Sequence, residues 1–277
     1  GLPVRAQACG RPIGLMLGLN LTLNPFSGHP SYTEIADLPL EKRVSIMRNE
    51  DFKKKILSEE CSSSNGLVKS IIRNIDNIYI LDKIPDYEPH KETSLGSKAK
   101  KLNRDITDYI YDVLLEDDGN SLLYYPIGNY LDYSLEASLE MISSDHTLLG
   151  LGDGGAHCST ICDASFTTHM LTFWGRDRTR GKKLDLPWII KSYSRDNALA
   201  IGLDDRGLIK EGMKADINII DFDNLTLYSP EIRYDLPAGG KRLVQRVDGY
   251  KYTIVSGKVT YKDGVSTGEL PGKLIRS

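Results

Sequence analysis

The sequence predicts an α/β fold followed by a small β-rich unit, and three observations favour this. Residues 124–200 read as strand, helix, strand, helix and helix, an order typical of parallel strands joined by crossover helices. The strand expected at 147–151 is short and apolar, as strands buried on both faces are. After Gly202 the chain changes to Ile- and Val-rich strands with glycine turns and no long helix.

The first part of the chain predicts a strand, a turn and a run of helix. Residues 4–8 alternate apolar and polar side chains, which indicates a strand, and Gly10 to Pro12 turn the chain. Residues 37–57 are expected to be helical, with Asp37 as the cap and a restart near Asn49. Further along, 71–81 has strand composition and 83–91 is irregular and rich in proline.

The middle of the chain carries the clearest helix signal. Asp105 is a suitable N-cap, apolar residues follow at helical spacing, and Gly119 ends the pattern. The remaining elements expected are strands at 122–127, 147–151, 215–222 and 250–261 and helices at 134–142 (capped by Ser134), 164–178 and 185–200 (capped by Asp185).

Composition narrows the function classes. The 277 residues carry a net charge of −3, which indicates neither a nucleic-acid nor a membrane partner. No apolar stretch is long enough to span a bilayer, and the start lacks the pattern of a signal peptide. Four cysteines are too few for a disulfide scaffold, so a cytoplasmic location is expected.

The richest chemical cluster is the glycine loop, residues 150–157, which reads Gly-Leu-Gly-Asp-Gly-Gly-Ala-His. Asp153 follows the carboxyl end of the expected strand, where active sites of parallel α/β folds lie. A carboxylate there can ligate a divalent metal or accept a proton from metal-bound water. The pattern alone also fits a tight Asp-Gly turn.

His157 has three interpretations: a metal ligand, a group that hydrogen-bonds substrate, or a polar residue leading into a helix. Together with Cys158, Cys162 and Asp163 it could suggest zinc, but the spacing is not that of a compact structural zinc site. The sequence contains no HxH, HExxH or Walker motif.

At these residues the chain resembles the amidohydrolase superfamily, and more narrowly its N-acyl-D-amino-acid deacylase (D-aminoacylase-like) branch. The glycine loop is similar to the family's last barrel strand with its catalytic aspartate, while 207–216 and 255–264 resemble strands of its small β-sandwich. Other family-like stretches lie at 7–19, 85–89, 114–119, 163–166 and 235–240. Gly152 departs from the family, in which serine tends to precede the aspartate.

The resemblance implies the C-terminal part of a (β/α)₈ metal-dependent hydrolase barrel. On this basis we expect a partial barrel at 1–203, with a helical insertion at about 24–145, and a sandwich segment at 204–277. Asp153 would be both metal ligand and general base, and His157 would contact substrate. The histidines that hold the family's zinc (one or two ions) have no counterparts here, so a missing N-terminal half of the barrel is an expected partner.

The implied function is metal-dependent hydrolysis of a linear amide C–N bond, as in deacylation of an N-acyl-(D-)amino acid, by a cytoplasmic enzyme that could be a homo-oligomer. The first alternative is a non-catalytic remnant or one subunit of a split amidohydrolase, because the chain opens in a strand without Met and lacks the ligand set. The second is a module that binds a small ligand at the glycine loop.

Overall fold

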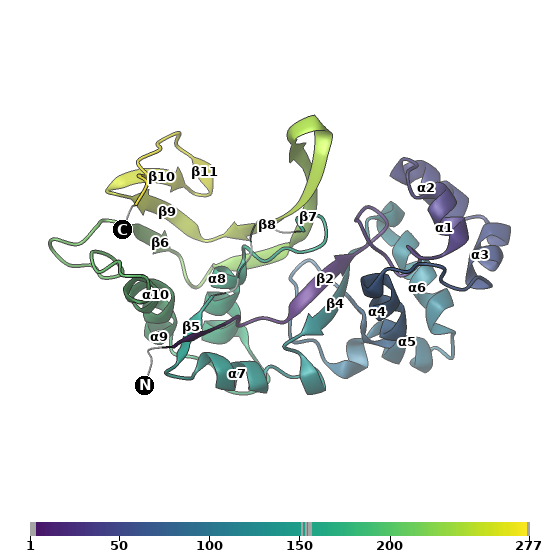
Figure 1. The fold of residues 1–277 in the computed structure, drawn as a ribbon, viewed down its shortest axis with the longest axis horizontal. Helices are drawn as coiled ribbons and strands as arrows, with labels where there is room; N and C mark the ends of the chain where they lie inside the picture. The colour runs from purple at the N-terminus through teal and green to yellow at the C-terminus, as the bar shows by residue number, and fades with distance from the viewer. Residues whose placement is uncertain (1–3, 151, 153, 155–156, 276–277) are drawn as a thin grey trace.

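The computed structural model describes residues 4–150, 152, 154 and 157–275 and has a mixed α/β architecture. Helices α1–α6 gather at one end of the molecule and strands β6 and β9–β11 at the other, with β2 and β4 between them (Figure 1). The strands are β1 Ala6–Ala8, β2 Ile13–Leu17, β3 Tyr79–Ile80, β4 Leu123–Gly128, β5 Thr147–Leu149, β6 Ile217–Ile220, β7 Thr226–Leu236, β8 Gly240–Asp248, β9 Tyr250–Val255, β10 Lys258–Lys262 and β11 Val265–Ser266. The α-helices are α1 Pro30–Ile35, α2 Leu40–Met47, α3 Glu50–Leu57, α4 Gly66–Arg73, α5 Leu95–Lys101, α6 Ile106–Leu115, α7 Glu136–Ile142, α8 Phe166–His169, α9 Leu186–Lys191 and α10 Asn197–Ala200.

Short 3₁₀ and π segments connect or extend these helices. Two π-helical turns, η5 and η6, continue α8 and α9, so the helices predicted at 164–178 and 185–200 are present but change their hydrogen-bonding pattern midway. The segments are η1 Ile75–Asn77, η2 Lys91–Thr93, η3 Glu116–Gly119, η4 Leu131–Tyr133, η5 Met170–Asp177, η6 Ser192–Asp196 and η7 Pro237–Gly239.

Strands β1 and β5 form a parallel pair in which Ala6 lies opposite Thr147 and Ala8 opposite Leu149. The parallel pairing expected for β5 is therefore present, but its partner is the strand near the start of the chain. The prediction of parallel strands joined by crossover helices over 124–200 was wrong in one respect. Strand β4 is antiparallel to β2 and β3 in a separate sheet. The segment between β4 and β5 therefore joins two sheets and is not a crossover within one.

The first half of the chain builds a large apolar core under β2, β4 and helices α1–α6. Phe26, Met47, Ile71 and Leu114 are fully buried in it. Asp105 caps α6 as predicted, because its side chain accepts hydrogen bonds from the backbone of Thr107 and Asp108.

Two local predictions are corrected here. The helix expected to start at Asp37 begins at Leu40, after Pro39, although Asn49 restarts it as α3 as expected. Most of the strand expected at 71–81 is the end of α4 and a 3₁₀ turn, because Val68 and Ile71 form the buried face of an amphipathic helix. Only Tyr79–Ile80 pairs as a strand.

Two antiparallel sheets follow residue 204. The strands expected at 215–222 and 250–261 are present as β6, β9 and β10, in the order β11-β10-β9-β6. The long hairpin β7–β8 was not predicted, because its ladder is interrupted near Pro230 and between Arg233 and Leu236. Among the described residues, no helix combines the length and apolarity needed to cross a membrane.

Candidate functional site

The carboxyl ends of β1 and β5 lie at the same end of the two-stranded sheet because the two strands are parallel. The chain leaves β1 through Cys9 to Arg11 and leaves β5 into the glycine loop, so these two segments converge. Asp153, predicted as catalytic base and metal ligand, lies outside the described residues. In the sequence it follows Leu149, the last residue of β5, by four positions.

Backbone hydrogen bonds hold the segment that follows the glycine loop from two sides. The amide of Met16 in β2 donates to the carbonyl of Thr160 (2.8 Å), and that of Leu243 in β8 donates to the carbonyl of Cys158 (2.6 Å). His157 is exposed and has a left-handed backbone (φ 48°). Its carbonyl accepts hydrogen bonds from the amides of Thr160 and Ile161, so its backbone forms a turn while its side chain faces solvent.

Arg11 is the central side chain of the region and is only 2% exposed. Its guanidinium donates to the carbonyl of Cys162 (2.7 Å) and to Ser165 Oγ (3.0 Å), and it pairs with Asp163 (3.2 Å). It also lies between the rings of Tyr87 (4.1 Å) and Phe166 (4.2 Å). A buried cation requires such partners, so Arg11 joins the end of β1 to the segment that follows the glycine loop.

Strand β8 contributes to the same cluster through Gln245. Ser165 Oγ donates to Gln245 Oε1, and Gln245 Nε2 donates to Tyr87 Oη (3.1 Å) and to the carbonyl of Tyr228 (2.6 Å). Beside this chain of contacts is a pocket of about 310 Å³ between the glycine loop, the start of α8 and β8. It is lined by Gly154, Cys158, Ile161, Cys162, Asp163, Ala164, Ser165, Thr168, Arg242, Leu243, Val244, Gln245 and Val247.

His169 belongs to the same cluster. Its ring stacks on that of Phe173 (4.7 Å between ring centres) and is edge-on to that of Tyr87 (5.4 Å between ring centres). Burial, reinforced by the charge of Arg11, lowers the pKa of His169 well below its ordinary value, against a hydrogen bond with the backbone of Gly10. The imidazole is therefore neutral near pH 7. Burial raises the pKa of the Cys162 thiol to about 11, so this cysteine is a thiol and not a thiolate at neutral pH.

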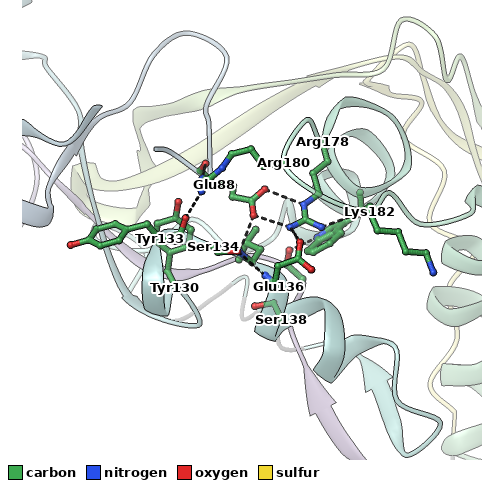
Figure 2. A network of polar contacts seen from close by, with 12 residues as sticks. Glu88, Tyr130, Tyr133, Ser134, Glu136, Ser138, Arg178, Arg180 and Lys182 are labelled. Carbon is green, nitrogen blue, oxygen red and sulfur yellow. Dashed lines mark hydrogen bonds and ion pairs between the residues drawn. The ribbon is translucent and has the colours of Figure 1, made fainter. Parts of the chain in front are cut away.

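A second buried ion pair fixes the surroundings of this cluster (Figure 2). Arg178, 0% exposed, makes two bonds of 2.9–3.0 Å to the carboxylate of Glu88, which is 2% exposed, and one of 2.8 Å to Glu136. Arg180 donates to the carbonyls of Glu88 (2.9 Å) and Tyr133 (2.7 Å). The irregular segment 83–91 is thereby tied to α7 and to the end of η5.

The described residues do not by themselves fit a zinc site. No group of three or more His, Cys, Asp or Glu residues among them is arranged to hold a metal ion. The nearest donors are unsuited, because Cys162 keeps its proton and Asp163 pairs with Arg11. The predicted ligand Asp153 is not among the described residues.

Sequence reasoning did not single out Arg11, Ser165, His169 or Gln245. Arg11 was interpreted as part of a turn, and the other three carry no motif on their own. A signal was nevertheless present, since three of the family-like stretches (7–19, 85–89 and 163–166) meet at Arg11. Separate stretches that resemble one family are candidates for meeting at one site.

Comparison with known proteins supports the resemblance to the amidohydrolase superfamily. The family model described as "Amidohydrolase family" matches residues 120–261, a range that contains the glycine loop, Arg178 and the hairpin β7–β8. No curated protein and no solved structure matches the chain. On the strength of the family match, the chain belongs to the amidohydrolase family.

Proposed function

We propose that this chain provides the last strands and the catalytic aspartate of a hydrolase that cleaves a linear amide C–N bond, most specifically an N-acyl-(D-)amino acid of the D-aminoacylase-like branch. The observation that supports the proposal is the parallel pair β1–β5, because the segment with Arg11 and the start of the glycine loop both follow the carboxyl end of one of its strands. Active sites of parallel α/β folds form at that end of the sheet.

In this proposal Asp153 is the general base that takes a proton from the attacking water, and His157 contacts the substrate. The exposed position of His157 is compatible with that contact. Arg11 has a positioning role, because its bonds to Cys162, Asp163 and Ser165 fix the residues after the loop. A buried guanidinium with all these partners is not available to bind a substrate carboxylate.

The proposed architecture assigns residues 1–203 to a partial (β/α)₈ barrel, with an insertion at about 24–145, and 204–277 to a sandwich segment. Two features support it. Within the described part of the chain, β1 and β5 pair only with each other, so further strands could add at either edge. The strands after 204 are antiparallel and separate from that pair.

The cofactor that the proposal entails is zinc, with Asp153 as the ligand from this chain and the other ligands from outside the described residues. The partner it entails is a segment or subunit that carries the rest of the barrel. We therefore expect the 277-residue chain alone to bind zinc weakly, because one carboxylate cannot replace a set of ligands.

The test is hydrolysis of N-acetyl-D-amino acids, with the L-enantiomers for comparison, by the full-length gene product and its Asp153→Asn variant. We expect the variant to lose about 10²–10⁴-fold in kcat, since a general base contributes on that order. The matched control is Asp37→Asn, which alters an exposed acid in the segment before α2. Unchanged kcat in Asp153→Asn, or turnover equal to the control's, would refute the role of Asp153.

The main alternative is a non-catalytic remnant or one subunit of a split enzyme. Zinc analysis and the same assay distinguish these alternatives when the 277-residue chain is measured alone and after mixing with the polypeptide encoded upstream. Activity that appears only on mixing supports a split enzyme, while no activity in any form supports the remnant.

A further inference from the structure

We infer that a second pocket, at the carboxyl end of β4, binds a neutral, hydroxyl-bearing ring compound of the carbohydrate class. The pocket is about 540 Å³, within the range of small-molecule sites. It lies between α4, η1 and the segment from β4 to η4. It is lined by Ser70, Asn74, Asn77, Tyr79, Tyr125, Pro126, Ile127, Gly128, Asn129, Tyr130, Asp132 and Tyr133.

The lining of this tyrosine pocket identifies the ligand chemistry. Four tyrosines supply flat aromatic faces, and three asparagines and a serine supply neutral donors and acceptors. Asp132, which is exposed, is the one ionisable acid among the lining residues. A sugar ring matches such walls, because its C–H face packs on aromatic rings while its hydroxyls bond to amide and phenol groups.

Part of the pocket wall has a left-handed backbone. Three lining residues without glycine's freedom, Asn129, Asp132 and Tyr133, have φ between 55° and 58°. A bulky residue such as Tyr133 is rarely found in this left-handed region, and strain of this kind clusters at ligand sites. The side chains of these three residues therefore line the pocket from an unfavourable backbone conformation.

The strained segment is held by contacts that orient its tyrosines. Tyr133 Oη donates to Asn77 Oδ1 (2.9 Å), its carbonyl accepts from Arg180, and Lys91 Nζ lies 4.8 Å from its ring centre. Tyr130 Oη donates to the carbonyl of Pro89. Figure 2 shows Tyr130 and Tyr133 at one end of the polar network and Lys182 at the other. These contacts preorganise the wall.

One lining group lacks a partner. Tyr79 is 3% exposed, and within the described part of the chain its hydroxyl has no hydrogen-bond partner. Buried hydroxyls are normally satisfied, so this one indicates a position where a ligand atom or water completes the bonding. Burial raises the pKa of Tyr79 above its ordinary value, so the hydroxyl stays protonated and can donate.

Binding of D-glucose, N-acetyl-D-glucosamine and maltose to the 277-residue chain, measured by saturation-transfer NMR and calorimetry, tests the inference. At least one of these sugars should bind with a Kd in the millimolar range or tighter, and charged glucuronate more weakly. Ile127→Trp, which fills the pocket from an exposed position, should weaken binding at least about 10-fold, and Tyr79→Phe about 5-fold.

Ile84→Trp and Tyr261→Phe are matched controls, since both alter exposed side chains that are not among the lining residues. Thermal melting of each variant verifies folding. The inference is overturned if no neutral sugar binds the parent chain, if glucuronate binds best, or if folded Ile127→Trp binds as well as the Ile84→Trp control. Amide hydrolysis is not measured here, so failure of the proposed enzymatic function leaves this result intact.

Discussion

Two regions of the molecule are stabilised in different ways. The helical half, residues 13–128, encloses its own core, in which Phe26, Met47 and Ile56 are fully buried. In the β-rich tail, residues 204–277, the buried apolar side chains that the structure describes are Leu225, Leu227 and Leu243, all on or beside the hairpin β7–β8.

Even those three side chains pack on the rest of the chain. Leu225 belongs to the buried cluster that contains Trp174 and Ile189, and the other two belong to the cluster of Tyr87 and Tyr124. The comparison shows that ladder hydrogen bonds define the sheet β11-β10-β9-β6, whereas apolar burial stabilises the helical half. The three changes below test this contrast, from the largest expected effect to the smallest.

Removing a core aromatic ring should separate the two regions most clearly. Phe26→Ala deletes a fully buried ring in edge contact with Tyr111 (5.3 Å), and we expect a loss of about 3–5 kcal/mol in the free energy of unfolding. Ile219→Ala in β6, whose side chain is 46% exposed, should cost less than about 1 kcal/mol. Urea unfolding followed by circular dichroism measures both, and equal losses would contradict the contrast.

The ion pairs provide the second test. Glu88→Gln leaves the guanidinium of Arg178 buried without its main charge partner, so we expect a loss of about 3 kcal/mol. Asp235→Asn breaks the pair with Arg242 in the tail, where both side chains are more than 40% exposed, and should cost less than about 1 kcal/mol. A double variant with Glu88→Gln and Arg178→Met should recover part of the loss if the unpaired charge is its cause.

The third test uses pH, because the tail contains no histidine. Burial lowers the pKa of His29 and, more strongly, of His169. The unfolded chain then binds more protons than the folded one below about pH 6.5, so stability should fall by up to about 1.4 kcal/mol per pH unit for each group as the solution is acidified. His169→Asn should reduce this slope, and exposed His146→Asn should leave it unchanged.

Hydrogen exchange between pH 7 and pH 5 locates the same effect in the chain. Rates corrected for intrinsic pH dependence should show protection lost first around α8 and α1, and later in β6 and β9–β11. Loss that begins in the tail would show that a group other than the two buried histidines controls the acid transition.

Local signals in the sequence predicted part of the local structure. Leu135 and not Ser134 is the N-cap of α7, and Asp185 is the N-cap of α9 without a side-chain hydrogen bond. Asp105 caps α6 and Asn49 starts α3, since each needs only its own side chain and the next backbone amides. Pairing across the chain was less predictable. The partner of β5 is β1, and no pattern within either strand specifies that choice. The hairpin β7–β8 was missed because its strands carry a proline and many half-exposed residues.

In the candidate site, too, local features could be predicted from the sequence and contacts between distant segments could not. The glycine loop could be found from its spacing, and its place after β5 follows from chain order. The cluster around Arg11 could not, because Arg11, Tyr87, Ser165 and Gln245 come from four separate segments. Their association depends on tertiary packing, which the periodicity of single elements does not encode.

The pairing of β1 with β5 also sets the order of events during synthesis. Ala6 leaves the ribosome long before Thr147, so β1 lacks its partner β5 while the helical half is being made. The helical half has its own core and short-range helices, and such segments fold faster than pairings that close long loops. The edge of nascent β1 that later pairs with β5 is therefore open for much of translation, and an open strand edge is prone to pair with other chains.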